Sequence, residues 1–335
     1  MFKRPRLSTR NSLVNASPAL ALLFLAASCS QPTDTPEQAQ TEVTESTTET
    51  TSEEGLILPA VWQSEDLGAP LSGIAVAGAL GSTVAVTFED GGLQFLNFEG
   101  DRITSKADLG VDKIADGRYT LLSGTPVTLF PGISQDGAVS LYIHGGELPE
   151  PLAYPLDIGT NSIVAGICTA PPATAAEGVM RLGFWTAADT RTLQSGRIVE
   201  VSDELVYLPD EPVAADQNIS ACVLTGEGAT VFSAPASAAT QLERRNYVYT
   251  LTLDSSGGYL LTDSEGGVTA FTIRDGISVR APDLPVDMAG TGDARGGGYS
   301  AGVVVIAGES EGGKHAVTYI DPSVVTLKPF GFQAE

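Results

Sequence analysis

Most of the chain consists of short runs of β-favouring residues that are separated by glycine-rich turns. Such runs occupy residues 83–88, 93–98, 138–144, 247–253, 259–262 and 268–273. Asp-Gly and Gly-Gly pairs stand between them, and glycine accepts the positive φ that tight hairpin turns require. The pattern therefore predicts consecutive antiparallel hairpins.

Helical periodicity is weak throughout, and the segment from Ala234 to Arg244 comes nearest to it. Roughly 20–24 strand candidates fill residues 55–335, and blades of about 40–45 residues divide them into five to seven repeats. An all-β, six-bladed β-propeller is the most natural fold. Two packed β-sandwiches are the alternative. The uniformly short hairpins and the lack of a Pro/Ser-rich linker favour the propeller.

The N-terminus has the pattern of an export signal. Residues 1–28 hold four basic residues and no acid, followed by the apolar run 19–27, which is too short to span a bilayer. An ordinary secretion signal is one interpretation. Leu25-Ala26-Ala27-Ser28-Cys29 resembles the bacterial lipobox, although Ala26 stands where leucine is usual. That resemblance implies a lipoprotein signal peptide, lipidation of Cys29 and, with Ser30 following, the outer membrane. We expect an outer-membrane lipoprotein that faces the periplasm or the cell surface.

A polar tether separates this signal from the globular part. Residues 30–54 contain eight threonines and seven acids, with no basic or aromatic residue. Such a segment cannot bury enough apolar surface to fold, so a disordered linker is expected over residues 29–54. The predicted domains are therefore 1–28, 29–54 and 55–335.

Composition narrows the function classes. The chain carries 18 basic and 41 acidic residues, a net charge of −23, which would repel a phosphate backbone and argues against nucleic-acid binding. Only two histidines, His144 and His315, are present, which disfavours multi-histidine metal sites. With Cys29 lipidated, Cys168 and Cys222 remain as candidates for a disulfide in an oxidising compartment. Two buried free thiols are the alternative.

Several segments together resemble one known family. Their order is 90–100 (DGGLQFLNFEG), 165–168 (AGIC), 184–186 (FWT), 196–200 (GRIVE), 221–223 (ACV), 258–266 (GYLLTDSEG) and 299–305 (YSAGVVV). These segments are similar to conserved hairpins of the β-propeller phytases. The resemblance implies a six-bladed propeller with calcium ions held by carboxylates at one end of the channel, where calcium, lysine and arginine bind phosphates.

The same comparison shows departures at the places that hold the family's ligands. Family carboxylate, tyrosine and lysine positions are occupied here by Ser220, Ala165, Gln194-Ser195, Arg244 with Asn246, and Ser233-Ala234-Pro235. Losing carboxylates lowers both calcium affinity and the positive field that stabilises a phosphoryl transition state. The resemblance therefore implies a binding or envelope-scaffold protein. A calcium-dependent phosphomonoester hydrolase acting on phytate or a simpler phosphate ester is the alternative.

A few polar residues are candidates for a reduced site. Asp263, Glu265 and Asp293 could ligate calcium, although acids in turns are usually solvated. The pair Arg244-Arg245 could contact an anion, or could form surface ion pairs. The expected partners are the membrane, through the lipid anchor, and a phosphate ester or an envelope protein. Trp62 and Trp185 are expected to pack in the core or between blades.

Overall fold

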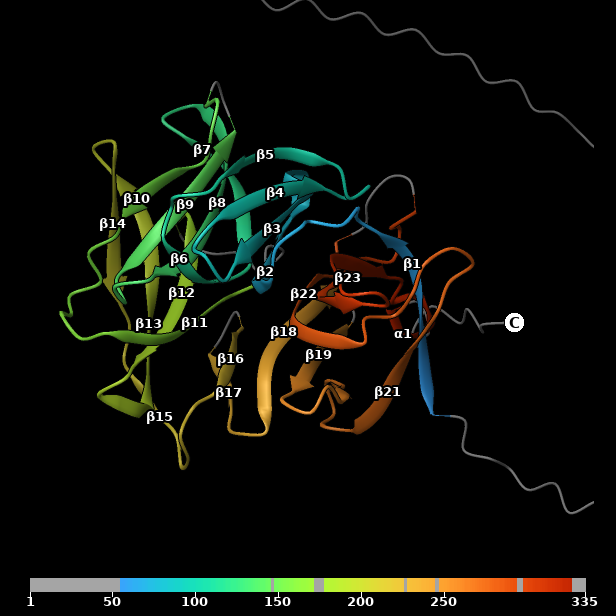
Figure 1. Cartoon of the computed structure of the whole chain (residues 1–335). Helices are drawn as coiled ribbons and strands as arrows, with labels where there is room; N and C mark the ends of the chain where they lie inside the picture. The colour runs from blue at the N-terminus through green and yellow to red at the C-terminus, as the bar shows by residue number, and fades with distance from the viewer. Residues whose placement is uncertain are drawn as a thin grey trace, which may run out of the picture. The chain divides into compact units, whose positions relative to one another are not determined.

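The computed structural model describes residues 55–145, 148–171, 178–225, 228–244, 247–293 and 298–326, all of which belong to one unit, Ser52–Glu335 (Figure 1). The predicted signal, the lipidation site Cys29 and the tether 29–54 lie outside the described residues. In this described part of the chain, helix is confined to a 3-10 turn, η1 (Ala79–Gly81), and a single α-helical turn, α1 (Ser323–Thr326). The other regular segments described are β-strands, as the hairpin pattern predicts.

The strands form four hydrogen-bonded sheets. The nine-stranded sheet contains β2 (Leu71–Gly78), β3 (Thr83–Phe88), β4 (Leu93–Asn97), β5 (Arg102–Lys106), β6 (Val111–Ile114), β7 (Gly117–Leu122), β8 (Thr125–Ser134), β9 (Val139–Gly145) and β10 (Leu152–Pro155). The five-stranded sheet contains β11 (Val164–Thr169), β12 (Met180–Thr186), β13 (Asp189–Val201), β14 (Glu204–Pro209) and β15 (Val213–Ala214).

The remaining strands make one small and one large sheet. The two-stranded sheet is β16 (Ala221–Leu224) with β17 (Ala229–Phe232). The eight-stranded sheet contains β1 (Leu56–Gln63), β18 (Ala236–Arg244), β19 (Tyr247–Asp254), β20 (Tyr259–Thr262), β21 (Val268–Arg274), β22 (Leu284–Thr291), β23 (Val303–Ser310) and β24 (Lys314–Ile320). The segment nearest to helical periodicity, Ala234–Arg244, is thus mostly the strand β18.

Local turn chemistry accounts for the hairpins. The β3–β4 turn has Gly91 at φ 88°, and Asp90 accepts a hydrogen bond from the backbone N–H of Gly92 at 3.0 Å. The β19–β20 turn repeats the arrangement with Gly257 at φ 88° and Asp254 as the acceptor. A side chain at these glycines would force an L-residue into the left-handed region. The predicted hairpins over 83–98 and 247–273 are therefore confirmed.

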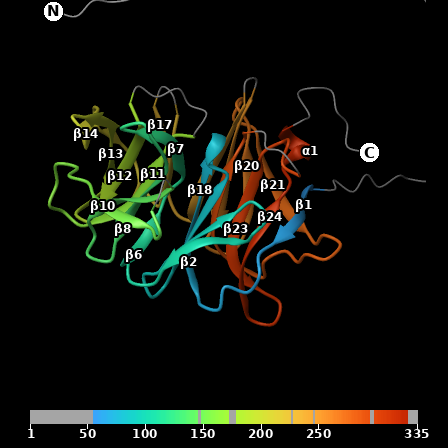
Figure 2. The same ribbon diagram turned by 90° about the horizontal axis from the view of Figure 1, so that it is seen from above.

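Six strands converge on the centre of the unit. Consecutive members of the series β2, β6, β11, β16, β18 and β22 contact one another, and β22 contacts β2 again. Figure 2 shows β6, β8 and β10–β14 on one side of β2, and β20, β21, β23, β24 and β1 on the other. The fold is all-β and propeller-like, as predicted, rather than a pair of stacked sandwiches. Six blades stay a prediction, which the six central strands support.

The first strand of the domain closes this arrangement. β1 pairs antiparallel with β24 at its C-terminal half and parallel with β21 at its N-terminal half. Trp62 of β1 is half-exposed, and its indole N–H donates to the carbonyl of Glu99 in the β4–β5 turn. Trp185 is buried against Gly166. Trp185 thus packs in the core, as expected, whereas Trp62 remains half-exposed and contacts the β4–β5 turn of another sheet through its indole N–H.

Candidate functional site

A central cavity of about 180 Å³ lies among the six inner strands. Each of these strands contributes to its wall, together with residues next to them. The charged side chains on the wall are Lys113, Asp116 and Asp287. The hydroxyl and amide side chains are Ser72, Thr169, Ser220, Ser237, Thr240 and Gln241. A concave cavity onto which a few polar groups converge is the usual place for a ligand, and this cavity is therefore the first candidate.

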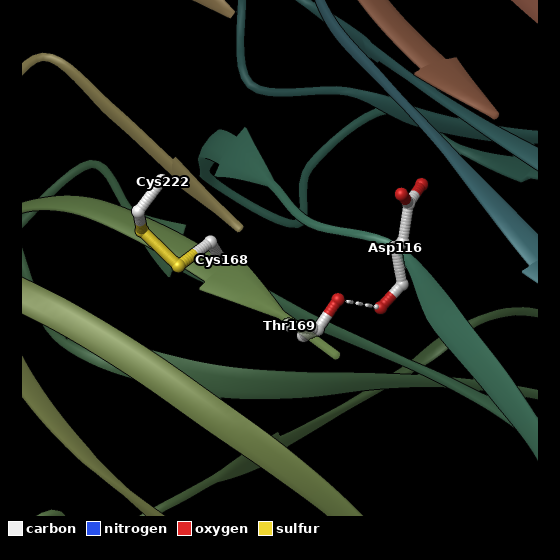
Figure 3. The surroundings of a disulfide bond; sticks show 4 residues. All are labelled: Asp116, Cys168, Thr169 and Cys222. Atoms are coloured by element: carbon white, nitrogen blue, oxygen red, sulfur yellow. Dashed lines mark hydrogen bonds between the residues drawn. A yellow bond between two sulfur atoms is a disulfide. The ribbon is translucent and has the colours of Figure 1, made fainter. Parts of the chain in front are cut away.

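Asp116 lies between β6 and β7 and joins three parts of the wall. Its Oδ1 accepts a hydrogen bond from the backbone N–H of Val76 at 2.8 Å, and its Oδ2 accepts one from the Thr240 hydroxyl at 3.2 Å. Its main-chain carbonyl accepts the hydroxyl of Thr169 at 2.8 Å (Figure 3). Burial raises the pKa of Asp116 to about 7, against the opposing effect of these hydrogen bonds to the carboxylate.

Asp287 on β22 is the second carboxyl group of the cavity. Its Oδ2 accepts a hydrogen bond from the backbone N–H of Ile74 at 2.9 Å, and its Oδ1 accepts one from Met288 at 2.8 Å. Burial raises the pKa of Asp287 to about 6, and the positive charge of Lys113 opposes this rise. Lys113 donates from Nζ to the carbonyl of Ala165 at 2.7 Å.

These two carboxyl groups accept hydrogen bonds from two backbone N–H groups on the same edge of β2. Ile74 and Val76 are two residues apart on β2, so their N–H groups point the same way, toward the side opposite β3. On that side β2 pairs with β7 only at Ala77 and Gly78, so no strand takes up the amides of Ile74 and Val76, and leaving them unpaired would be costly. Asp287 caps the first amide and Asp116 the second, so the acids join β2 to β22 and to the β6–β7 connection.

The disulfide lies beside the same cavity. Cys168 of β11 and Cys222 of β16 form a disulfide with a Cα–Cα distance of 5.7 Å (Figure 3). Both residues are buried, with Trp185, Leu193, Ile219 and Leu224 around them. The predicted pairing is confirmed, and the alternative of two free thiols is wrong.

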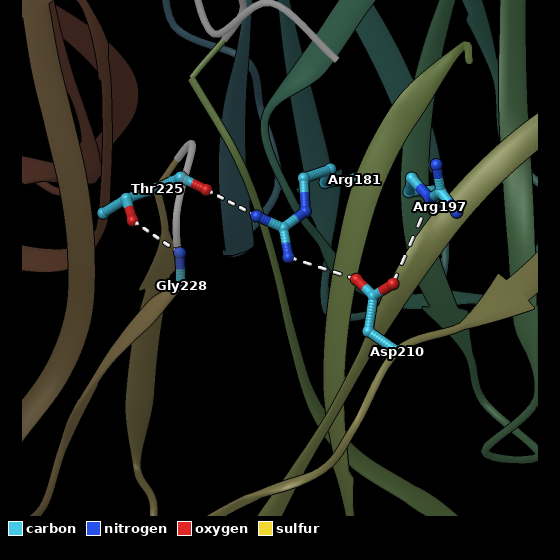
Figure 4. Close-up of polar contacts among 5 residues, drawn as sticks. All are labelled: Arg181, Arg197, Asp210, Thr225 and Gly228. Atoms are coloured by element: carbon cyan, nitrogen blue, oxygen red, sulfur yellow. Dashed lines mark hydrogen bonds and ion pairs between the residues drawn. The ribbon is translucent and has the colours of Figure 1, made fainter. Parts of the chain in front are cut away.

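A polar cluster makes a second connection between the same two sheets. Arg181 of β12 donates from Nη1 to the carbonyl of Thr225 at 2.7 Å and pairs through Nη2 with Asp210 at 3.2 Å (Figure 4). Asp210 also lies 4.0 Å from Arg197 of β13. Thr225 directly follows β16, the first strand of the two-stranded sheet, and its hydroxyl accepts the N–H of Gly228 across the turn. The arginine therefore holds the tip of the β16–β17 hairpin.

Replacing Arg181 by alanine should destabilise the domain by about 1–3 kcal/mol, because the carbonyl of Thr225 and the carboxylate of Asp210 lose a charged partner at a site that is only 15% exposed. The matched control is Arg280→Ala, since the ion pair of Arg280 with Asp275 is exposed to solvent, which screens it, and its loss should cost much less than that of Arg181. Urea unfolding of both variants checks the difference. Equal losses for the two variants would refute the anchoring role of Arg181.

The predicted cation ligands have other local roles. Asp263 accepts hydrogen bonds from the backbone N–H groups of Glu265 and Gly267 at 2.9 and 2.8 Å, which closes the β20–β21 turn. Asp293 follows β22, and its N–H donates to Thr291. No three His, Cys, Asp or Glu side chains in the described ranges are grouped to hold a metal ion, so Asp263, Glu265 and Asp293 form no such cluster.

The predicted anion contact is only partly visible. Arg244 ends β18 and is half-buried, and its Nη1 is buried without a hydrogen-bond partner. Arg245 lies outside the described residues. A joint role of the two arginines stays a prediction.

Sequence reasoning missed the two carboxyl groups of the cavity. Asp116 follows Ile114-Ala115 and precedes Gly117, and Asp287 stands between Val286 and Met288. An acid inside an apolar segment is a signal that could have marked both residues, because a buried carboxylate needs a partner. Their partners could not have been named, since Ile74 and Val76 are far away in sequence.

Comparisons with known proteins give no family. No protein-family model and no curated protein matches the chain. Among solved structures, the crystal structure of Chaetomium thermophilum Raptor is similar at a TM-score of 0.45 and 9% sequence identity, over 78% of this chain and 28% of that one. This chain thus spans less than a third of that protein, and the similarity carries no functional argument. Within the described part, no helix is long and apolar enough to cross a membrane.

Proposed function

We propose that this chain is a lipid-anchored bacterial envelope protein whose propeller-like domain, similar to a phytase propeller without its calcium ligands, binds or scaffolds another molecule. The signal pattern over residues 1–28 and the cysteine at 29 support export and lipidation. The Cys168–Cys222 disulfide supports an oxidising compartment, because such bonds rarely persist where thiols are kept reduced.

The observation that favours a binding role over a calcium-dependent hydrolase is how the two cavity carboxyl groups are bonded. Asp116 and Asp287 are both engaged by backbone N–H groups of β2, so their oxygens serve the fold rather than a calcium cluster. Lys113, the lysine on the cavity wall, already donates to a main-chain carbonyl. A phosphate ester needs a positive field, whereas these two acids add negative charge as they ionise. Ser220, which replaces a family glutamate, also lines the cavity.

Phosphate release separates the binding role from the alternative of a calcium-dependent phosphomonoester hydrolase. The mature lipoprotein in detergent is incubated with phytate and with p-nitrophenyl phosphate, with added calcium and with a chelator. No release above the chelator control is the expected result. Calcium-dependent turnover of either substrate would overturn the binding role in favour of a hydrolase.

The anchor has a separate test. Substituting Cys29 by alanine removes the atom that would be lipidated, so the protein should move from the membrane fraction to the soluble fraction of a bacterial cell. Fractionation and labelling with a radioactive fatty acid check this, with Ser30→Ala as the matched control. Unchanged membrane recovery and labelling in the Cys29 variant would contradict the proposed anchor.

A further inference from the structure

The two-stranded sheet is the short member of the ring around the cavity. β17 pairs with β16 alone among the described strands, while the other sheets continue outward through four or more strands. In an antiparallel pair, alternate residues of the outer strand direct their N–H and C=O groups away from the partner. The outer edge of β17, Ala229–Phe232, therefore presents backbone donors and acceptors that no described strand takes up (Figure 1).

The sheet on one side of this edge leaves apolar side chains exposed. Leu182, Ile198 and Tyr207 pack toward β8 and β9, so the opposite face of that sheet carries the alternate residues. Arg181 lies on this opposite face and contacts Thr225 of the short hairpin, which shows that the face is turned toward β16 and β17. Leu208 pairs across from Arg197 in the same row, and Val206 follows on the same face; they are 41% and 36% exposed.

The strands β18–β21, on the other side of β17, also leave apolar side chains exposed. Leu251, Leu261 and Phe271 pack against β22 and β23, so alternate residues of β19–β21 face the other way. That face carries Leu260, which is 40% exposed, and Val268, which is 63% exposed. Its innermost strand, β18, contacts β16. Where two full sheets face each other, such apolar residues are buried between them. Val84 and Val86 of β3, for example, are fully buried against β23 and β24.

We propose that the outer edge of β17 accepts one extended segment of a partner protein as an added β-strand. Main-chain hydrogen bonds would supply affinity, and side chains on both faces of the added strand would cover Leu208 and Val206 on one side and Leu260 and Val268 on the other. The partner segment is therefore short, uncharged and rich in apolar, β-branched residues. The chain's own tether, with seven acids in residues 30–54, has the wrong chemistry for these walls.

The inference deepens the proposed binding role and rests on it. An end-blocked peptide that copies β20 with the glycine before it, Gly258–Thr262, serves as the uncharged probe, because β20 holds the third-strand position in the neighbouring sheet. The control peptide has proline in place of both central leucines and cannot pair along its length. Amide hydrogen exchange of the mature lipoprotein is followed with each peptide present.

The expected result is saturable slowing of exchange over Ala229–Phe232 with the β20 peptide and none with the proline peptide. Val268→Lys should weaken this binding at least tenfold, because it places a charge on an exposed wall without disturbing the core. Leu80→Lys, at an exposed apolar site in η1, should leave it unchanged. Gel filtration shows that each variant is folded.

Three outcomes would overturn the inference: no protection of β17, equal binding of both peptides, or unchanged binding by Val268→Lys. Protection that depends on protein concentration without peptide would also overturn it, in favour of a second copy of the chain at the edge. The phosphate-release assay is independent. If the peptide does not bind and no phosphate is released, only the strand-addition site is refuted. If phosphate is released in a calcium-dependent way, the proposed function itself is refuted.

Discussion

Replacing both Cys168 and Cys222 by alanine should lower the free energy of unfolding by about 2–4 kcal/mol relative to the parent. The bond closes a sequence separation of 54 residues, and the loop-closure entropy of such a cross-link corresponds to roughly 4 kcal/mol as an upper value. Cavities left by two buried sulfur atoms add to the loss. The effect is large because β16 and β17 have no outer strands in the described structure and depend on their connections to β11 and β12.

Urea unfolding of the alanine variant and of the reduced parent measures this loss. The reduced parent keeps both sulfur atoms, so the difference between the two samples isolates the cross-link from the packing. Combining the cysteine changes with Arg181→Ala tests whether the two connections act on one element, since coupled sites are not additive. A midpoint equal to that of the oxidised parent would show that the disulfide does not hold the short sheet in place.

Stability should fall as the pH rises from about 4 to about 7. The pKa of Asp116 is raised by burial to about 7 in the folded domain, from 3.8 in the unfolded chain, and that of Asp287 to about 6. The folded state therefore holds more protons than the unfolded state between pH 4 and pH 7, and stability is lost as the pH rises through that window. Both carboxyl groups face the cavity and keep some contact with solvent, so we expect about 2 kcal/mol in total rather than the roughly 4 kcal/mol that full burial of Asp116 would give.

Asp116→Asn provides the decisive comparison. Asparagine keeps an oxygen that accepts the N–H of Val76 but cannot ionise, so the variant should lose most of the pH dependence and exceed the parent in stability at pH 8. Asp112→Asn removes the same charge from an exposed position of β6 and controls for the relief of the chain's overall negative charge. Parallel pH profiles for the two variants would contradict the assignment to Asp116.

Below about pH 4, stability should instead fall as the pH is lowered. Hydrogen bonds to Ser256 and the turn amides lower the pKa of Asp254, and the N–H of Ala281 with the guanidinium of Arg280 lowers that of Asp275. These carboxylates stabilise the fold above the unfolded pKa, and that contribution is lost as the pH falls below about 4. Thermal unfolding should therefore show its maximum midpoint near pH 4.

Hairpins were predictable because their causes are local. Asp90 and Gly91 lie within the same turn, and the alternation on either side of them gives β3 and β4 without reference to the rest of the molecule. The same holds for the series β19, β20 and β21. The segment Ala234–Arg244 shows the limit of local reasoning, because its weak helical pattern gives way to the strand β18, which is fixed by pairing with β19.

Sequence alone determined the all-β class, the propeller-like repetition, the acidic charge and the pair of cysteines available for a disulfide. Tertiary structure decided the rest, because each remaining feature joins residues far apart in the chain. Asp116 meets Val76 across 40 residues, and Asp287 meets Ile74 across 213. Burial sets the pKa values of these acids, and burial exists only once the inner strands have assembled. The open edge of β17 likewise arises from what neighbouring sheets contribute and what this short sheet lacks.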